Sequence, residues 1–216
     1  MASKLQSSIA AAGRRAPRRG ARPYHHGNLP EALAAAAEAL VRERGVHAFS
    51  LRECARRAGV THSAPGHHFG DITGLLTEVA ARGFERLTAR MRAERGDAEG
   101  SSALHRIGRG YVAFAVSDPV IFLLMFHSDR VDRGNPKLQS AGAEAFGELV
   151  SAVAAATGKS SRDEDALRFA WSGVHGMAML LIDRRLKPAP GERASDPLAL
   201  AEGTIARIVH TIATFR

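Results

Sequence analysis

Residues 45–76 constrain the fold more than any other stretch, because their pattern fits two short helices that lead directly into a long one. Gly45 and Gly59 interrupt the apolar pattern, and a glycine between two short helical runs is typical of a tight helix–turn–helix connection. The second short run, about Thr61 to His68, carries small and polar residues where a core helix would carry leucines. Such a helix is suited to contact with another molecule, and the best candidate is a DNA groove.

Helical periodicity continues to the end of the chain and predicts an all-α protein. Apolar residues recur at spacings of three and four, and no segment alternates as a strand does. Asn28 and Ser50 are each followed by glutamate three residues later, which is the capping-box spacing, and Thr61 and Asp71 are expected to cap the next two helices. The expected helices cover about 29–44, 51–58, 61–68, 72–95 and 104–117, one that begins at 119, and 136–157, 163–185 and 198–215.

Positive charge is concentrated at the front of the chain. Residues 1–68 hold 11 Lys and Arg against 4 Asp and Glu, whereas residues 69–216 hold 19 against 18. This favours a polyanion-binding segment attached to a neutral body. A coding preference for arginine is an alternative source of the arginines, but it leaves the scarcity of acids at one end unexplained.

Residues 1–23 show no apolar periodicity, and five arginines alternate there with Ala, Gly and Pro. We expect a disordered basic arm. Such an arm can reach into a minor groove. The alternative is a solvated tail with weak, nonspecific attraction to nucleic acid. After the arm we expect a helix–turn–helix domain over 24–70 and a larger helical domain over 71–216.

The composition argues against secreted and membrane proteins. A single cysteine, Cys54, permits no internal disulfide, which fits a reducing compartment. The longest apolar run, 120–126, is far shorter than the roughly 20 residues that span a bilayer. No apolar segment follows the N-terminal arginines as in a secretory signal. These features predict a cytoplasmic protein without a membrane partner.

The order of these segments resembles the TetR family of bacterial transcription regulators. The matching stretches are YHHGNL at 24–29, FSLRECARRAGV at 49–60, HSAP at 62–65, HHFGD at 67–71 and GLL at 74–76. Trp171 with His175 and Gly176 is similar to a C-terminal signature of one TetR subfamily. The resemblance implies an all-helical homodimer with an N-terminal three-helix DNA-binding domain and a larger C-terminal helical bundle for effector binding and dimerisation. It implies a repressor of a double-stranded DNA operator.

Two positions depart from the family pattern. The family usually has an aromatic residue, commonly a phosphate-contacting Tyr, where this chain has Gly66, and it often has lysine where this chain has Ile72. The N-terminal arginines, or His67 and His68, are candidate replacements. We expect these departures to affect DNA affinity more than the fold.

Short polar side chains allow the third helix to approach DNA closely. Ser and Thr can bond to bases or phosphates, and His can donate to guanine or phosphate. Ser50, Arg52 and Tyr24 are expected to contact the DNA backbone, which positions the helix without reading sequence. The alternative for each residue is ordinary solvent exposure, and Phe69 is expected in the core. The predicted DNA-binding residues are Arg18, Arg19, Arg22, Tyr24, Ser50, Arg52, Thr61, His62, Ser63, Ala64, Gly66, His67 and His68.

The C-terminal half is richer in aromatic and sulfur-containing side chains. Trp171 and His175 are four residues apart and share a helix face, so they can supply polar groups to an apolar cavity. The alternative is a solid core, which would make the protein an effector-independent DNA-binding protein. The resemblance favours a small apolar effector, and the predicted ligand-binding residues are Tyr111, Phe114, Phe122, Met125, Phe126, Phe146, Trp171, His175 and Met177.

The last two helices are candidates for a dimer interface. Ser172, Gly173 and Gly176 permit close helix approach, and the apolar stripe of the last helix can complete half of a four-helix interface. The alternative is that both helices are buried within the monomer.

We expect no metal, no cofactor and no catalytic site. Adjacent histidine pairs at 25–26 and 67–68 do not share a helix face, and neither a second cysteine nor an HExxH pattern is present. A small helical enzyme is the competing class, but no nucleophile–base pair, phosphate loop or paired-carboxylate spacing supports it.

Overall fold

A computed structural model describes residues 29–159, 162–186 and 196–214. Within these residues the chain forms nine helices and no strand, which confirms the all-α prediction. The predictions for the basic arm, Arg18, Arg19, Arg22, Tyr24 and the Asn28 cap lie outside the described residues. The helices are α1 Leu29–Arg44, α2 Leu51–Ala58, α3 Ala64–Phe69, α4 Ile72–Arg95, α5 Gly100–Ser117, α6 Pro119–His127, α7 Pro136–Thr157, α8 Glu164–Ile182 and α9 Pro197–Thr214.

Two helices begin elsewhere than the sequence predicts. α3 begins at Ala64, because Ser63 and not Thr61 occupies the N-cap position. Pro65 therefore lies in the first turn, where its missing N–H has no helical partner to lose. α5 begins at Gly100, four residues before the expected start at Leu104.

The predicted caps of α2 and α4 differ in outcome. The Asp71 carboxylate accepts a hydrogen bond from the Gly74 N–H at 2.9 Å, which confirms it as the N-cap of α4. Ser50 occupies the predicted N-cap position of α2, but the predicted capping box is wrong, because the Ser50 side chain makes no capping hydrogen bond. Glu53 instead accepts hydrogen bonds from Arg56 and Arg57 on the same helix.

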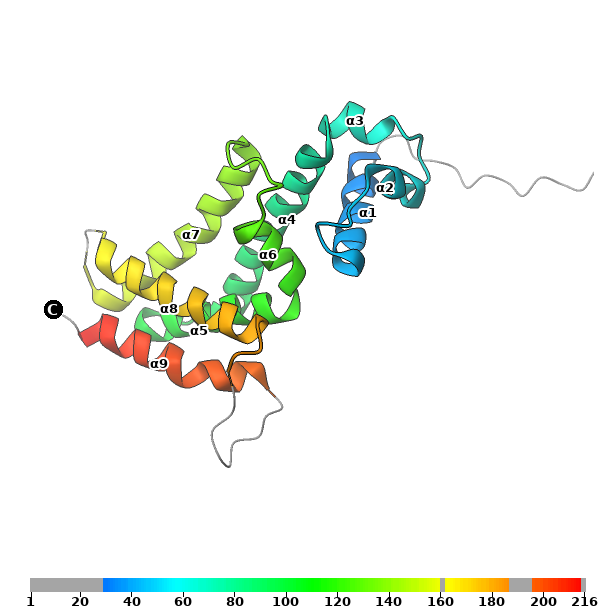
Figure 1. Cartoon of the computed structure of the whole chain (residues 1–216). Helices are drawn as coiled ribbons and strands as arrows, with labels where there is room; N and C mark the ends of the chain where they lie inside the picture. The colour runs from blue at the N-terminus through cyan, green and yellow to red at the C-terminus, as the bar shows by residue number, and fades with distance from the viewer. Residues whose placement is uncertain (1–28, 160–161, 187–195, 215–216) are drawn as a thin grey trace, which may run out of the picture.

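α4 joins an N-terminal head, formed by α1, α2 and α3, to a C-terminal body (Figure 1). One end of α4 contacts α1 and α3, and the rest contacts α5, α6 and α7. Leu75 and Leu76 are fully buried in the head core with Leu33, Leu40 and Cys54. Burial therefore continues along α4 from the head into the body.

Ion pairs also connect α1 of the head with α4 and with the start of α6. Arg42 of α1 donates to Asp118, which precedes α6, at 2.6 Å. Arg82 and Arg86 of α4 pair with Glu31 and Glu38 of α1 at 2.7 and 2.9 Å. These exposed or half-buried pairs fix the direction in which α1 lies on α4 more than they add stability.

α5 is the central helix of the body and contacts α4, α7, α8 and α9. Gly110 allows its backbone to lie close to α4, since a Cβ at this position would be 2.9 Å from the Met91 Cα and 3.2 Å from the Arg90 carbonyl oxygen. No single helix in the described ranges is long and apolar enough to cross a membrane.

Replacement of Gly110 by alanine should destabilise the protein, because α4 and α5 would have to separate. The expected loss of unfolding free energy is about 1–3 kcal/mol, as for other overpacked cores. Chemical denaturation followed by circular dichroism measures it. Gly147→Ala is the matched control: a Cβ there has no neighbour within 4 Å, so the change should stabilise α7 by about 0.5–1 kcal/mol. Equal effects of the two changes would contradict the close packing of α4 on α5.

Candidate functional site

The head presents exposed polar residues on α3, beside both ends of α2 and at Arg52 within α2. Thr61 and Ser63 contact each other through their hydroxyl oxygens at 3.3 Å. Ala64 and Pro65 are buried in the head instead. A thymine methyl therefore has no free access to Ala64, and we remove this residue from the expected contacts. The exposed members of the predicted set are Ser50, Arg52, Thr61, His62, Ser63, Gly66, His67 and His68.

Glycines and short contacts hold this surface in place. Gly59 adopts the left-handed conformation with φ 70° at the turn, and the Val60 N–H donates to the Ala55 carbonyl at 3.0 Å. At the other end of α3, a Cβ on Gly74 would lie 1.9 Å from the Phe69 carbonyl oxygen. α3 is therefore seated directly on the start of α4.

Gly66 and Ile72, the two residues that depart from the family pattern, differ in exposure. Gly66 is exposed, and a Cβ there would meet nothing within 4 Å. Ile72 is half-buried and packs against the core, as does Phe69, whose predicted core position is confirmed. An aromatic side chain at position 66 is therefore compatible with the fold.

Most arginines of the described head are paired with carboxylates. Residues 29–68 hold five arginines and four glutamates, a net charge of +1, so the front-end excess belongs mainly to residues 1–28. Arg42, Arg44, Arg56 and Arg57 form ion pairs. Arg52 forms no ion pair with any described residue and is exposed, so it is available to a phosphate.

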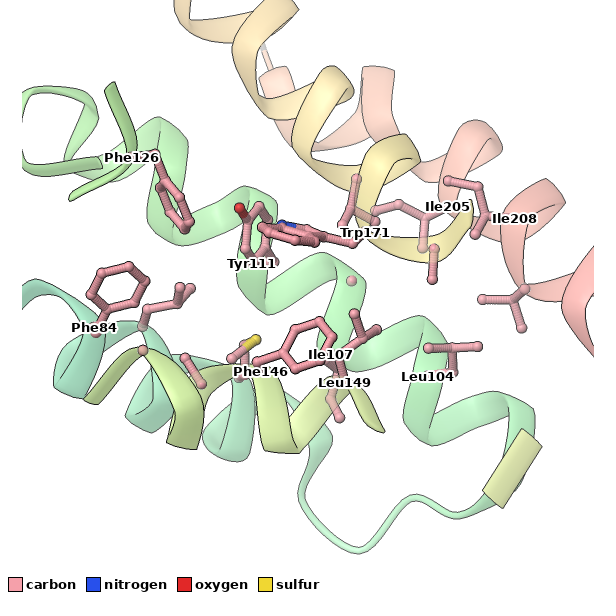
Figure 2. Close-up of a pocket in the computed structure, with 18 of the residues that line it drawn as sticks. Phe84, Leu104, Ile107, Tyr111, Phe126, Phe146, Leu149, Trp171, Ile205 and Ile208 are labelled. Carbon is pink, nitrogen blue, oxygen red and sulfur yellow. The ribbon is translucent and has the colours of Figure 1, made fainter. Parts of the chain in front are cut away.

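The body contains a partly open apolar cavity of about 370 Å³, within the size range of small-molecule sites. Figure 2 shows its side chains along α5, from Phe84 and Phe126 at one end to Leu104 and Ile208 at the other. Four predicted ligand-binding residues line it, namely Tyr111, Phe126, Phe146 and Trp171.

Five predicted ligand-binding residues do not line the cavity. Phe122 and Met125 are fully buried in the packing of α6, and Phe114 and Met177 are also buried outside the cavity. His175 follows Val174, which does line the cavity, and one residue turns a helix by about 100°. The imidazole of His175 is therefore directed at the aromatic cluster behind the lining.

His175 supports the cavity wall. Its Nδ1 atom and the Tyr111 hydroxyl form a hydrogen bond of 2.8 Å, and its ring stacks on Phe122 and His127. Burial, followed by the neighbouring His127, lowers the pKa of His175 below its usual value, and burial raises the pKa of Tyr111. Both groups are therefore neutral at neutral pH.

Sequence reasoning missed all of the aliphatic lining and the charged residue at the cavity. The aliphatic residues form stripes at helical spacing, which give the same signal whether a stripe packs solidly or surrounds a void. Arg133, in the loop between α6 and α7, is the charged lining residue that was missed. The missed lining is Phe84, Leu87, Met91, Leu104, Ile107, Gly108, Arg133, Gly142, Ala145, Leu149, Ala170, Val174, Ile205, Ile208 and Val209.

The outer face of α8 and α9 combines exposed apolar and small residues. Phe169 and Leu180 share a face of α8 with Gly176 and are 45% and 42% exposed, which is high for large apolar side chains. Trp171 is 43% exposed but lies on the other side of α8, where it lines the cavity. A Cβ on Gly173 would lie 2.5 Å from the Ile208 Cδ1, so this glycine serves packing within the protomer, whereas Gly176 is open. The apolar stripe of α9, including Ile208, is buried within the protomer, and this corrects the expectation that it faces a partner.

In the described part of the chain, no group of three or more His, Cys, Asp or Glu residues is placed to hold a metal ion. Cys54 is buried, and its thiol donates a weak hydrogen bond to the Leu33 carbonyl at 3.4 Å. Burial raises its pKa to about 11. The thiol is therefore protonated and enclosed.

Cys54 should react with dithiobis-nitrobenzoate at pH 8 only after unfolding, because both burial and the raised pKa suppress the thiolate. The folded pKa of about 11 lies above the reference value of 9.0. The thiol therefore favours the folded state below pH 9 and loses this contribution as the pH rises toward 11. The reaction is followed by absorbance with and without guanidinium chloride, with Cys54→Ser as the control. Equally fast labelling in both solutions would contradict the enclosed thiol.

Both parts of the chain match known protein families. Residues 33–79 match the description bacterial regulatory proteins, tetR family, and residues 104–208 match the tetracyclin repressor-like C-terminal domain. A protein with unknown function from Rhodococcus sp. RHA1 is 31% identical over 87% of this chain and 98% of its own, with a TM-score of 0.70. A search of curated proteins finds no match.

Two solved structures of bacterial regulators share the fold. PfmR, a TetR family transcriptional regulator from Thermus thermophilus, is 20% identical over 82% of this chain and 97% of its own, with a TM-score of 0.59. NalD, the secondary repressor of the MexAB-OprM multidrug efflux pump in Pseudomonas aeruginosa, is 21% identical over 85% of this chain and 94% of its own, with a TM-score of 0.55. At these identities the likeness concerns the fold alone.

Proposed function

Because this chain belongs to the TetR family of bacterial transcription regulators, we propose that it acts as a homodimeric repressor that a small apolar effector releases from its operator. One observation carries the proposal. α4 seats α3 at its start, through Asp71 and Gly74, and lines the apolar cavity further along, with Phe84, Leu87 and Met91. A ligand that moves the far part of α4 therefore acts on the element that carries α3.

The exposed surface of the head supports contact with a major groove through α3. A single head offers few base contacts, and a two-fold dimer doubles them when its α3 helices lie roughly 34–36 Å apart, or a multiple of this distance. The outer face of α8 and α9 is the proposed dimer interface, since Phe169 and Leu180 flank the open Gly176. Small residues on α9, including the open Gly203, allow a close approach there.

Two routes link the cavity to the head. The first is α4 itself. The second is the loop between α6 and α7, where the Arg130 guanidinium donates to the Val46 carbonyl in the head at 2.5 Å and the Asp132 N–H donates to the Thr77 hydroxyl of α4 at 2.8 Å. An effector can shift the equilibrium only by its differential affinity for the two head positions. A typical coupling of about 1–3 kcal/mol changes DNA affinity roughly 5–150-fold.

The cavity favours this reading over an effector-independent protein with a solid C-terminal core. A ligand that enters the cavity should raise the melting temperature of the protein and lower its affinity for operator DNA. A dimer that binds DNA but whose affinity no cavity ligand changes would favour the alternative.

Variants of the head should separate sequence reading from backbone contact. His67→Ala and Ser63→Ala should lower the ratio of random-DNA to operator Kd, since a good base contact is worth about 1–3 kcal/mol. Arg52→Ala should weaken both DNAs alike and reduce the salt slope by about one. The operator is first selected from a random library, and fluorescence anisotropy gives each Kd.

Arg90→Ala is the matched control for these variants. Arg90 is an exposed arginine of α4 that pairs with Glu94 on the same helix. Its removal deletes one positive charge far from α3 and should leave both affinities unchanged. Equal losses on operator and random DNA for all three head variants would refute the assigned roles.

Arg130→Ala should loosen the head, because it removes the side-chain contact to the Val46 carbonyl. We expect a broader distribution of distances between spin labels on the two heads of the dimer, measured by pulsed electron resonance. Operator affinity should fall roughly fivefold or more. Arg90→Ala again serves as the control. An unchanged distance distribution in Arg130→Ala would exclude this loop as a route.

A further inference from the structure

The apolar cavity contains one charged lining residue among those described, Arg133. Its guanidinium donates to the carbonyl oxygens of Met125 and Ser128 at 2.5 and 3.3 Å. The contact with the Met125 carbonyl places Arg133 near Phe126, which Figure 2 labels at the same end of the lining as Phe84. Arg133 itself is exposed, so the cavity has a cationic end that faces solvent and an apolar remainder.

Arg133 has hydrogen-bonding capacity left for a ligand. A guanidinium carries five N–H donors, and two backbone carbonyls engage two of them here. In the described part of the chain no carboxylate forms an ion pair with it. Arg92 and Arg95, by contrast, both pair with Glu148. The two carbonyl contacts also fix the guanidinium before a ligand arrives.

The other polar groups that line the cavity are less able than Arg133 to bind a charged group of a ligand. The Tyr111 hydroxyl is already engaged with His175, and burial raises its pKa, so it carries no charge. Among the described residues no Asp or Glu lines the cavity, so nothing there would compensate a cationic ligand. A buried cation without a partner is disfavoured, whereas a carboxylate beside Arg133 gains a charge-assisted hydrogen bond.

We propose that the effector is an elongated apolar molecule with one carboxylate at its end, bound with the carboxylate at Arg133 and the apolar chain along α5 toward Leu104 and Ile208. This inference rests on the proposed function, because it names the ligand class of the same cavity. The length of the lining accommodates the chain, and Arg133 selects an acid over an alcohol of equal length. Binding also engages the loop that carries Arg130, which contacts the head.

The test uses decanoic acid and decan-1-ol as matched probes. Trp171 is the single tryptophan of the chain and lines the cavity, so its fluorescence reports occupancy. The full-length protein should bind decanoate roughly two- to fivefold more tightly than decanol, as expected for a carboxylate paired with a solvent-exposed guanidinium. Arg133→Gln should lose this preference while its Kd for decanol stays within about twofold.

Two further variants keep the result interpretable. Arg133→Lys retains the positive charge and should retain a preference for the acid, even if Arg133→Gln fails to fold. Gly142→Leu places a side chain in the cavity and should weaken both probes. Gly142→Ala is its control, because a Cβ there has only the Phe84 ring within 4.0 Å. Melting temperatures without ligand verify that each variant folds.

Each outcome has a defined meaning. Equal binding of the two probes, binding of neither, or an acid preference that survives in Arg133→Gln overturns the carboxylate assignment. Operator binding, measured on the same preparation, tests the proposed function separately. A protein that binds DNA and is released by decanol but not by decanoate retains the proposed function and loses this inference. A protein that binds decanoate with the predicted preference but ignores DNA retains this inference's binding site and loses the proposed function.

Discussion

The packing of α4 against both the head and the body is the constraint on which the rest of the structure depends. Leu75 and Leu76 are fully buried in the head, while Leu87 and Met91 belong to the cavity wall. Because protein interiors are close-packed, a displacement of one part of such a helix is transmitted rather than absorbed. α4 therefore contacts both the cavity and α3, and this shared helix is the physical basis of the proposed control of DNA binding by a ligand.

The sequence predicts the head well, because its turns depend on local chemistry. Gly59 and Asp71 act within a few residues of their own positions, and both behave as expected. The failures are also local. Ser63 replaces Thr61 as the N-cap of α3, and Glu53 binds arginines instead of closing a capping box. The choice of N-cap and of side-chain partner depends on groups that compete within one helical turn. Hydrophobic periodicity does not show which of these groups forms the bond.

The cavity is predicted less well, because its shape depends on how several helices meet. Trp171 and Tyr111 are found from their residue type, but His175 turns away by one helical step and supports the wall from behind. Arg133 lies in a loop, where no periodicity indicates its direction. The stripe of α9 that includes Ile205 lines the cavity and is not available to a partner. Only the tertiary packing shows which of these side chains line the cavity, which pack behind it and which remain available to a partner.

The pairing of head arginines with glutamates affects how the protein would find its site on a chromosome. Arg56 and Arg57 are neutralised by Glu53 and Glu43, so the folded head retains little free charge to attract a distant polyanion. The excess of positive charge belongs mainly to residues 1–28 of the sequence. Capture and sliding along unrelated sequence would therefore depend on that segment, while residence time at the correct site would depend on α3. Substitutions in residues 1–28 would then change the rate of association with DNA, and substitutions in α3 would change the residence time at the operator, each without the other.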